Sequence, residues 1–257
     1  MTRRHFTFPC EGEQLAATLD EAPGKTGLLL VTGGNEVRAG AWNGQAQFAS
    51  RIAAAGFPVL RFDRRGVGDS GGTNGGFRSS APDIAAALAA FREQCPQITR
   101  ITGFGNCDAA TALGLFGGDS LDGLVLSNPW TIEDSEEDVP PAVVRDHYRR
   151  RLSDPAAIRR LLTGQVSLRK LLRSLLAALH PAKAPSNLAA ELTQRLSPFK
   201  GPLRFLIAGR DRTGLAFLAT WDKADPRVRL CPDATHSYVE PEAQDWLVAQ
   251  TLDLLRG

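Results

Sequence analysis

The stretch Ile101-Thr-Gly-Phe-Gly105-Asn106-Cys107-Asp108-Ala109-Ala110 passes from an apolar run directly into a sequence that favours a helix. A reactive side chain on such a sharp turn needs small residues two positions before and after it, and Gly105 and Ala109 flank Cys107 in this way. The helix that follows directs backbone N–H groups at the reacting centre, so the N–H of Asp108 is placed to stabilise an oxyanion. The stretch predicts Cys107 as a nucleophile; the alternative is a buried structural cysteine at a tight junction.

The segments on both sides of this turn alternate between continuous apolar runs and Ala-rich helical patterns. Strands are predicted at Gln14–Asp20, Gly27–Thr32, Pro58–Asp63, Ile98–Phe104, Gly123–Ser127, Leu203–Ala208 and Val228–Cys231. Helices are predicted at Gly44–Ala55, Ala81–Gln94, Asp108–Phe116, Leu215–Lys223 and Glu242–Leu255, the second with Ser80 as its cap. Continuous apolar strands are typical of a parallel sheet buried on both faces, so the pattern predicts an α/β fold.

A basic segment interrupts this alternation after the fifth predicted strand. Residues 140–200 hold twelve Lys or Arg and three Asp or Glu, a net charge of +9 within a chain of net charge +2. Further helices are predicted there, at Ala142–Leu152, Pro155–Leu162, Leu168–Leu179 and Asn187–Leu196. We therefore predict a core of residues 1–130 and 201–257 and a helical lid of residues 131–200.

The charge of the predicted lid has two interpretations. It could attract an anionic substrate, an acyl carrier or an anionic membrane surface. It could also be the solvated outer face of an amphipathic lid, which is favoured because the leucines of 168–179 form an apolar stripe with a surface of its own to bury.

The composition excludes several classes of protein. The chain has 257 residues, of which 43% are hydrophobic, and it lacks an apolar run long enough to span a membrane. Its cysteines, Cys10, Cys95, Cys107 and Cys231, form no C-x-x-C pair and no metal-ligand spacing, so neither a zinc site nor another cofactor is expected. No nucleic-acid partner is indicated. The basic start of the chain lacks the apolar stretch of a signal peptide, which predicts a cytoplasmic protein.

Two further motifs accompany the Cys107 turn. Gly33-Gly34-Asn35-Glu36 follows a predicted strand, and Asp63-Arg-Arg-Gly66-Val-Gly68-Asp-Ser70 follows the next one. Together the three motifs resemble the α/β-hydrolase superfamily, whose Gly-x-Ser-x-Gly elbow becomes Gly105-x-Cys107-x-Ala109 here. The resemblance implies an α/β-hydrolase fold. It also implies that Gly34 or Asn35 supplies the second backbone donor of an oxyanion hole, beside the N–H of Asp108.

The superfamily orders its catalytic triad along the chain as nucleophile, acid and histidine. Asp211 lies in the loop after the strand Leu203–Ala208 and is favoured as the acid over Asp225 and Asp233. His236 follows the last strand and precedes the last helix, which makes it the predicted base. The other histidines are His5, on the first strand, and His147 and His180, in the lid. Asp211 would orient His236, which would take the thiol proton of Cys107.

A closer resemblance is to the family called exosortase A system-associated hydrolase 1. It rests on Cys107–Ala110, on Gly33-Gly-Asn-x-x-Arg38 with Gly40, and on residues 56–66. The resemblance implies a cytoplasmic bacterial hydrolase whose gene accompanies a protein-sorting and exopolysaccharide system. Dienelactone hydrolases, the familiar cysteine members of the superfamily, are similar in their chemistry only.

These observations predict a cofactor-free hydrolase of carboxylic esters or thioesters, with a small acyl-bearing substrate and an acyl-thioenzyme intermediate. Two alternatives stay open. The same residues could serve an acyltransferase, or the fold could belong to a non-catalytic accessory protein. The sequence does not indicate an oligomeric state.

Overall fold

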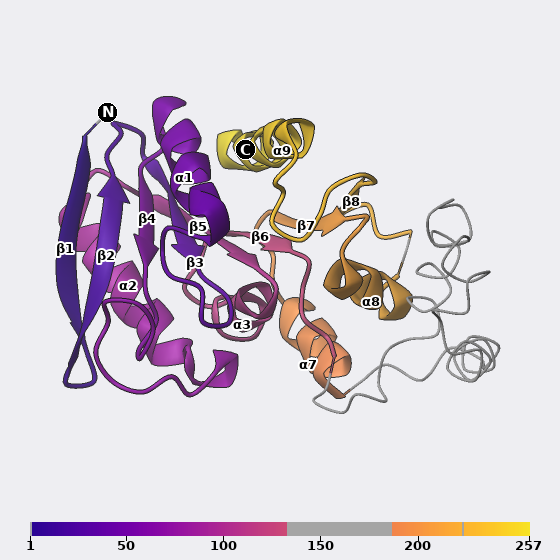
Figure 1. Ribbon diagram of the computed structural model, residues 1–257, viewed down its shortest axis with the longest axis horizontal. Helices are drawn as coiled ribbons and strands as arrows, with labels where there is room; N and C mark the ends of the chain where they lie inside the picture. Colours follow the sequence, from indigo (N-terminus) through magenta and orange to yellow (C-terminus); the bar gives the residue numbers. More distant parts are fainter. Residues whose placement is uncertain (1, 133–186, 223) are drawn as a thin grey trace, which may run out of the picture.

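The computed structural model describes residues 2–132, 187–222 and 224–257 (Figure 1). These residues form an eight-stranded sheet in the order β1-β2-β4-β3-β5-β6-β7-β8. Strand β2 runs antiparallel to both of its neighbours, and the pairs from β4 to β8 are parallel. The strands are β1 (Arg3–Cys10), β2 (Glu13–Asp20), β3 (Thr26–Val31), β4 (Val59–Phe62), β5 (Arg100–Asn106), β6 (Gly123–Ser127), β7 (Leu203–Ala208) and β8 (Val228–Cys231). The predicted parallel sheet is confirmed.

Helices cover both faces of the sheet (Figure 1). They are α1 (Gly44–Ala54), α2 (Ala81–Gln94), α3 (Asp108–Phe116), α7 (Asn187–Leu196), α8 (Arg212–Thr220) and α9 (Pro241–Arg256), with short 3₁₀ turns η1 (Ala41–Asn43) and η2 (Phe77–Ser79). Helices α1 and α9 lie on one face, and α2, α3, α7 and α8 lie on the other.

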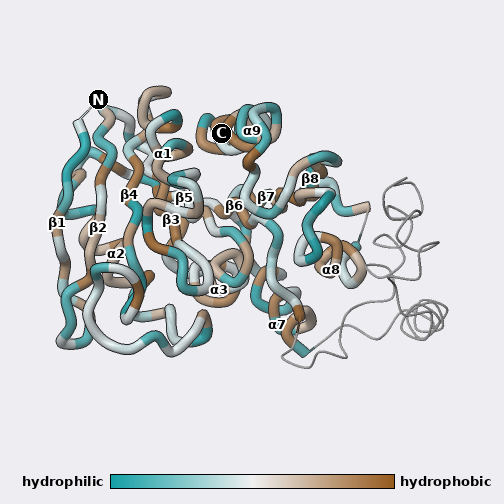
Figure 2. The backbone as a smooth tube through the Cα atoms, viewed as in Figure 1, coloured by the Kyte–Doolittle hydropathy of each residue, from teal (hydrophilic) through white to brown (hydrophobic). Residues whose placement is uncertain are grey.

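Each face has its own apolar core, because neighbouring residues of a strand point to opposite sides. In β3, Leu28 and Leu30 belong to the core under α1 and α9, whereas Leu29 and Val31 belong to the core on the other face. Brown segments in the central strands and in the helices that cover them mark these two cores in Figure 2. The continuous apolar runs of the sequence therefore reflect burial from both sides.

Most predicted element bounds agree with the structure to within two residues, and the exceptions have local causes. Strand β1 was not among the predicted strands because it lies at the sheet edge, where exposed and buried residues alternate. Helix α8 starts at Arg212 rather than Leu215, because Asp211 caps it. Ser80 makes no capping bond at α2; its hydroxyl accepts a hydrogen bond from Arg64 instead, at 2.9 Å.

Helix α7, the last helix of the predicted lid, packs on the core. Its residues Leu188, Leu192 and Leu196 are at most 3% exposed. A Cβ atom on Gly114 of α3 would lie 2.4 Å from the Leu192 side chain, so the two helices pack closely at this point. The predicted helices at 142–152, 155–162 and 168–179 lie outside the described residues, as do His147 and His180.

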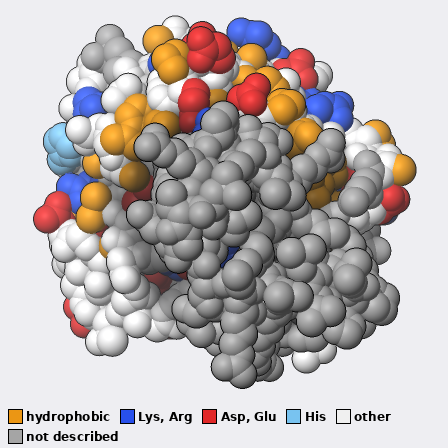
Figure 3. Space-filling model, turned by 45° about the vertical axis from the view of Figure 1, so that its right-hand side comes forward, with side chains coloured by type: hydrophobic (Ala, Val, Ile, Leu, Met, Phe, Trp, Pro, Cys, Tyr) orange, Lys and Arg blue, Asp and Glu red, His pale blue; other side chains and the backbone are white. Residues whose placement is uncertain are grey.

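In the part of the chain that the structure describes, no helix is long and apolar enough to cross a bilayer. Figure 3 shows acidic, basic and hydrophobic side chains intermixed over the coloured part of one face.

The turn after β4 holds the loop after β3 in place. The Asp63 side chain is fully buried and accepts hydrogen bonds from the backbone and guanidinium of Arg38 and from the Asp69 N–H. Gly68 has a φ of 56°, and a Cβ there would lie 2.3 Å from an Asp63 oxygen. This turn therefore fixes the far end of the loop that begins with Gly33.

Candidate active site

Cys107 lies at the sharp turn between β5 and α3. Its backbone has φ 62° and ψ −129°, a conformation that costs a non-glycine residue about 1–3 kcal/mol. Backbone hydrogen bonds hold it: its N–H donates to the Ser127 carbonyl at 3.0 Å, and its carbonyl accepts from the N–H groups of Ala110, Thr111 and Trp130 at 3.1–3.3 Å. The surrounding backbone thus maintains a strained cysteine that is itself only partly buried.

The requirement for small neighbours at this turn is visible at Gly105. A Cβ atom there would lie 2.7 Å from the Ala109 carbonyl carbon and oxygen and from the Ala110 nitrogen. Strand β5 and helix α3 therefore touch through backbone atoms at this point. Ala109 is fully buried. Its single methyl group fits at the position where the superfamily motif has its second glycine.

Asp211 and His236 form an ion-pair contact, with 2.9 Å between Asp211 Oδ2 and His236 Nδ1. Asp211 is 7% exposed and caps α8, where the same oxygen accepts the Gly214 N–H at 3.0 Å. Because the carboxylate is fixed by the helix that it caps, it holds the imidazole ring from a rigid element. The His236 side chain is 40% exposed and can be reached from solvent.

His236 also interacts with the Cys107 side chain. The pKa of His236 is raised to about 10, first by its hydrogen bond to Asp211 and then by its interaction with Cys107, against the opposing effect of burial. An imidazolium at neutral pH stabilises a neighbouring thiolate. The structure thus brings Cys107, His236 and Asp211 together in one chain of contacts.

The alternatives to Asp211 and His236 have other surroundings. Asp225 bonds to Arg227 and Trp221, and the hydrogen bond from Arg227 is the main cause that lowers its pKa to about 2. Asp233 is exposed in the turn after β8. His5 is on β1, and its ring contacts the Thr18 hydroxyl at 2.9 Å.

The predicted oxyanion loop has an unforeseen contact. The Gly34 N–H donates to Asp108 Oδ1 at 2.7 Å, and the Gly34 carbonyl accepts from Arg64 at 2.6 Å. The second Asp108 oxygen lies 3.6 Å from Arg64 Nη2. The prediction that Gly34 is an oxyanion donor needs correction in this respect: its N–H becomes available only if the Asp108 side chain moves away.

Asn35 is the better placed of the two candidates. Within residues 2–132, 187–222 and 224–257, its backbone N–H donates to no other group, and neither does the N–H of Asp108. Asn74 donates to the Asn35 side chain at 2.7 Å and so fixes the loop. Among the described residues, the predicted backbone donors that stay unpaired are therefore those of Asp108 and Asn35.

Sequence reasoning missed a polar network behind the site. Asn106 donates to the His236 carbonyl at 3.1 Å and accepts from Asn128 at 3.0 Å. Asn128, with a φ of 42°, also accepts the Ala208 N–H at 2.8 Å. The buried Tyr238 hydroxyl contacts Ser127 at 2.9 Å. These bonds tie the ends of β5, β6 and β7 to the loop that carries His236. The only sequence signal is the polar residues at the ends of β5 and β6.

The fold agrees with comparisons to known proteins. A family model described as "Alpha/beta hydrolase family" matches residues 28–250. The chain belongs to this family. A search of the curated proteins found no match.

Solved structures of similar fold include other members of this hydrolase class. The esterase Pf2001 from Pyrococcus furiosus has a TM-score of 0.60 at 18% identity, over 99% of this chain and 90% of its own. The α/β hydrolase GrgF from a Penicillium species has a TM-score of 0.66 at 16% identity, over 100% and 98% of the two chains. An α/β serine hydrolase homologue from Coxiella burnetii has a TM-score of 0.61 at 15% identity, over 100% and 97%. At these identities the likeness concerns the fold. The serine in the last description contrasts with the cysteine at the elbow of this hydrolase.

The site brings together the Cys107 thiol, the His236 imidazole and the Asp211 carboxylate. Within the part of the chain that the structure describes, no three His, Cys, Asp or Glu side chains are grouped as metal ligands.

Proposed function

We propose that this α/β hydrolase cleaves carboxylic ester or thioester bonds, with Cys107 as the nucleophile, His236 as the acid–base residue and Asp211 as the residue that orients it. The observation that carries the proposal is the chain of contacts from Asp211 through His236 to Cys107, at a strained strand-to-helix turn. A buried structural cysteine would need neither the strain nor the histidine.

In the proposed reaction His236 holds the thiol proton and the Cys107 thiolate attacks the acyl carbon. A carbon–sulfur bond forms, and the negative charge on the carbonyl oxygen is stabilised by the N–H groups of Asp108 and Asn35. The bond to the leaving group breaks, and His236 gives the leaving group its proton. Water then loses a proton to His236 and attacks the thioester, which releases the carboxylic acid and restores the thiol.

The biological setting is part of the proposal. The motifs at residues 33–40, 56–66 and 107–110 support a cytoplasmic bacterial enzyme associated with an exosortase and exopolysaccharide system. The basic residues of the predicted lid support an anionic substrate or an acyl carrier as the partner, which the lid would attract at long range.

The test is a panel of p-nitrophenyl esters and acyl-CoA thioesters of short and long chains, assayed with wild type, Cys107→Ala and His236→Ala. The proposal expects turnover of at least one class by wild type and a loss of at least about 100-fold in both variants. Turnover that persists in Cys107→Ala would exclude this cysteine as the nucleophile. No turnover and no acyl adduct on Cys107 across the whole panel would favour a non-catalytic accessory protein.

A second assay separates hydrolysis from acyl transfer. Added alcohols and amines compete with water for the acyl-thioenzyme, so the two products are measured together. Hydrolysis predicts the free acid as the main product, whereas a dominant ester or amide product would identify an acyltransferase.

A further inference from the structure

The side chains of Asn106 and Asn128 form an amide pair where β5 and β6 end. Asn128 Nδ2 donates to Asn106 Oδ1 at 3.0 Å. Asn106 directly precedes Cys107 along the chain. Asn128 directly follows Ser127, whose carbonyl accepts the Cys107 N–H at 3.0 Å. The amide pair is therefore attached to both sides of the backbone hydrogen bond that holds the nucleophile turn.

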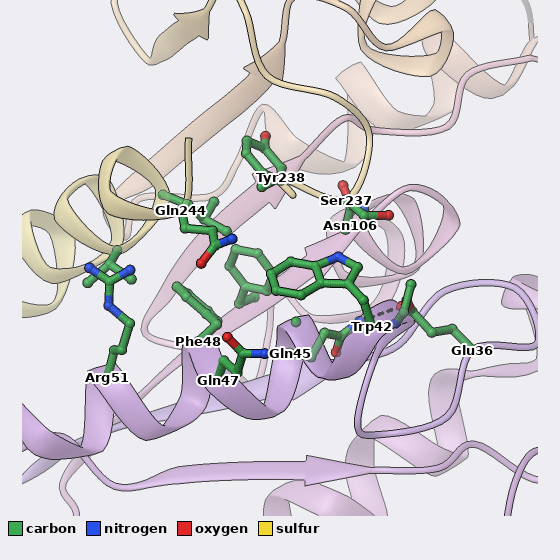
Figure 4. Close-up of a pocket in the computed structure, with 15 residues that line it drawn as sticks. Glu36, Trp42, Gln45, Gln47, Phe48, Arg51, Asn106, Ser237, Tyr238 and Gln244 are labelled. Carbon is green, nitrogen blue, oxygen red and sulfur yellow. Dashed lines mark hydrogen bonds between the residues drawn. The ribbon is translucent and has the colours of Figure 1, made fainter. Parts of the chain in front are cut away.

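The Asn106 end of the amide pair holds the loop of His236. Asn106 Nδ2 donates to the His236 carbonyl at 3.1 Å. Figure 4 shows Asn106 together with Ser237 and Tyr238, the two residues that follow His236, at one end of a pocket between α1 and α9. A single side chain next to the nucleophile thus bonds to the backbone of the proposed base.

The Asn128 end of the amide pair holds the turn that leads to Asp211. Asn128 Oδ1 accepts the Ala208 N–H at 2.8 Å, and the Ala208 carbonyl accepts the Asp211 N–H at 3.0 Å. Asn128 is fully buried and has a φ of 42°, a conformation that asparagine adopts more readily than most residues. The amide pair therefore connects the three chain segments that carry Cys107, His236 and Asp211.

The polarity of this chain of hydrogen bonds is fixed at both ends. The Ala208 N–H can only donate, and the His236 carbonyl can only accept. Each amide between them therefore has one orientation that satisfies both of its neighbours. An amide at position 106 meets this requirement, whereas a carboxylate lacks the donor and an aliphatic side chain lacks both groups.

From this arrangement we infer that Asn106 is a positioning residue of the proposed reaction: oriented by Asn128, its amide holds the His236 loop against the turn of Cys107. The inference deepens the proposed function and rests on it for the reaction that the positioning serves. Asn106 acts on the thiol through His236. If its bonds served stability alone, their loss would ease unfolding without a change in thiol reactivity that depends on His236.

The test measures the rate at which iodoacetamide alkylates Cys107 at pH 6.5, followed by peptide mass spectrometry of the full chain. The variants are Asn106→Leu, His236→Gln and the double variant, since leucine has nearly the shape of asparagine but no donor or acceptor. We expect Asn106→Leu to slow alkylation about 3- to 10-fold, as the loss of one hydrogen bond implies. In the His236→Gln chain the same substitution should have no further effect, because no imidazolium remains to be misplaced.

Thr251→Val is the matched control, because it also removes one buried hydrogen bond, from the Thr251 hydroxyl to the Leu247 carbonyl at 2.9 Å within α9. It should lower the midpoint of urea unfolding and leave the alkylation rate unchanged. Asn106→Ala takes the place of Asn106→Leu if the latter does not fold. An unchanged rate in the Asn106 variant, or an equal slowing with and without His236, would overturn the inference.

Ester turnover gives a second measurement that depends on the proposed function. A misplaced His236 should lower kcat and leave KM unchanged, because the substrate still binds. An absence of turnover in wild type would count against the proposed function and leave the alkylation result intact. Normal turnover in Asn106→Leu would overturn the positioning role and leave the proposed function intact.

Discussion

The Asp108 carboxylate accepts the backbone N–H of Gly34 at 2.7 Å, and so links the residue after the nucleophile to the predicted oxyanion loop. Arg64, which is 2% exposed, completes this clamp by donating to the Gly34 carbonyl at 2.6 Å. Both backbone polar groups of Gly34, in two successive peptide groups, are therefore held. In the part of the chain that the structure describes, Asn35 rather than Gly34 therefore has the unpaired N–H.

Removal of Arg64 should loosen the clamp and destabilise the fold. Arg64→Met leaves the buried Ser80 hydroxyl and the Gly34 carbonyl without their donor, which costs about 1–3 kcal/mol. Urea unfolding measures the loss. Arg92→Met, at an exposed arginine with one weak bond to the Ser120 carbonyl, is the control and should change stability by less than about 0.5 kcal/mol. Equal effects of the two substitutions would contradict the clamp.

Gly105 should not tolerate even one added methyl group. Gly105→Ala places a Cβ 2.7 Å from the α3 backbone, so the elbow must shift, at a cost of about 1–3 kcal/mol. We also expect slower alkylation of Cys107, because the shift moves its thiol away from His236. Gly118→Ala is a matched control, since its nearest neighbour would be Phe199 at 3.9 Å. Thermal unfolding and iodoacetamide kinetics on both variants check the prediction, and a neutral Gly105→Ala would refute it.

Cys107 should be alkylated selectively at pH 6.5. Burial raises the pKa of Cys10 to about 11, and it also raises the pKa values of Cys95 and Cys231. Cys107 alone has the His236 imidazolium beside it. We expect it to react with iodoacetamide at least about 10-fold faster than the other three, and His236→Gln to remove most of that advantage. Peptide mass spectrometry identifies the labelled residue; uniform slow labelling would speak against the thiolate–imidazolium pair.

The Asp211–His236 contact should stabilise the fold in a pH-dependent way. The folded pKa of His236, about 10, lies above its ordinary value of 6.5, so the folded state retains the proton in the interval between them. The stabilisation is therefore complete below about pH 6.5 and is lost as the pH rises through about 10.

Unfolding of wild type and Asp211→Asn at pH 6, 8 and 10 tests this sign. The stability difference between the two proteins should be largest at pH 6 and smallest at pH 10. Asp245→Asn breaks an exposed contact with Arg51 and serves as the control, with no such trend. A difference that grows with pH would contradict the assignment of the shift to this contact.

Local signals in the sequence predicted the fold well where they were strong. Pro82 and Asp83 mark the first turn of α2, and its bounds at Ala81 and Gln94 were predicted to the residue. The order of nucleophile, acid and histidine along the chain led to three residues that the structure brings into contact. The roles of these residues stay predictions until activity is measured.

Contacts between distant segments could not be predicted in this way. The hydrogen bond between Gly34 and Asp108 forms because β3 and β5 pair in the sheet. The residues next to Gly34 or Asp108 in the sequence do not indicate this pairing. The same is true of Ser80, whose side chain has a partner 16 residues away. Strand β1 escaped detection because half of its residues face solvent.

The central claim is that Cys107 carries the acyl group during turnover. The most direct measurement is rapid quenching of the reaction with an active p-nitrophenyl ester, followed by mass spectrometry of the peptide that contains residue 107. The account predicts a thioester adduct on Cys107 that forms as fast as p-nitrophenolate is released, decays in water, and accumulates in His236→Ala if it forms there at all. Turnover with no adduct on this peptide, or an equal rate in Cys107→Ala, would contradict it.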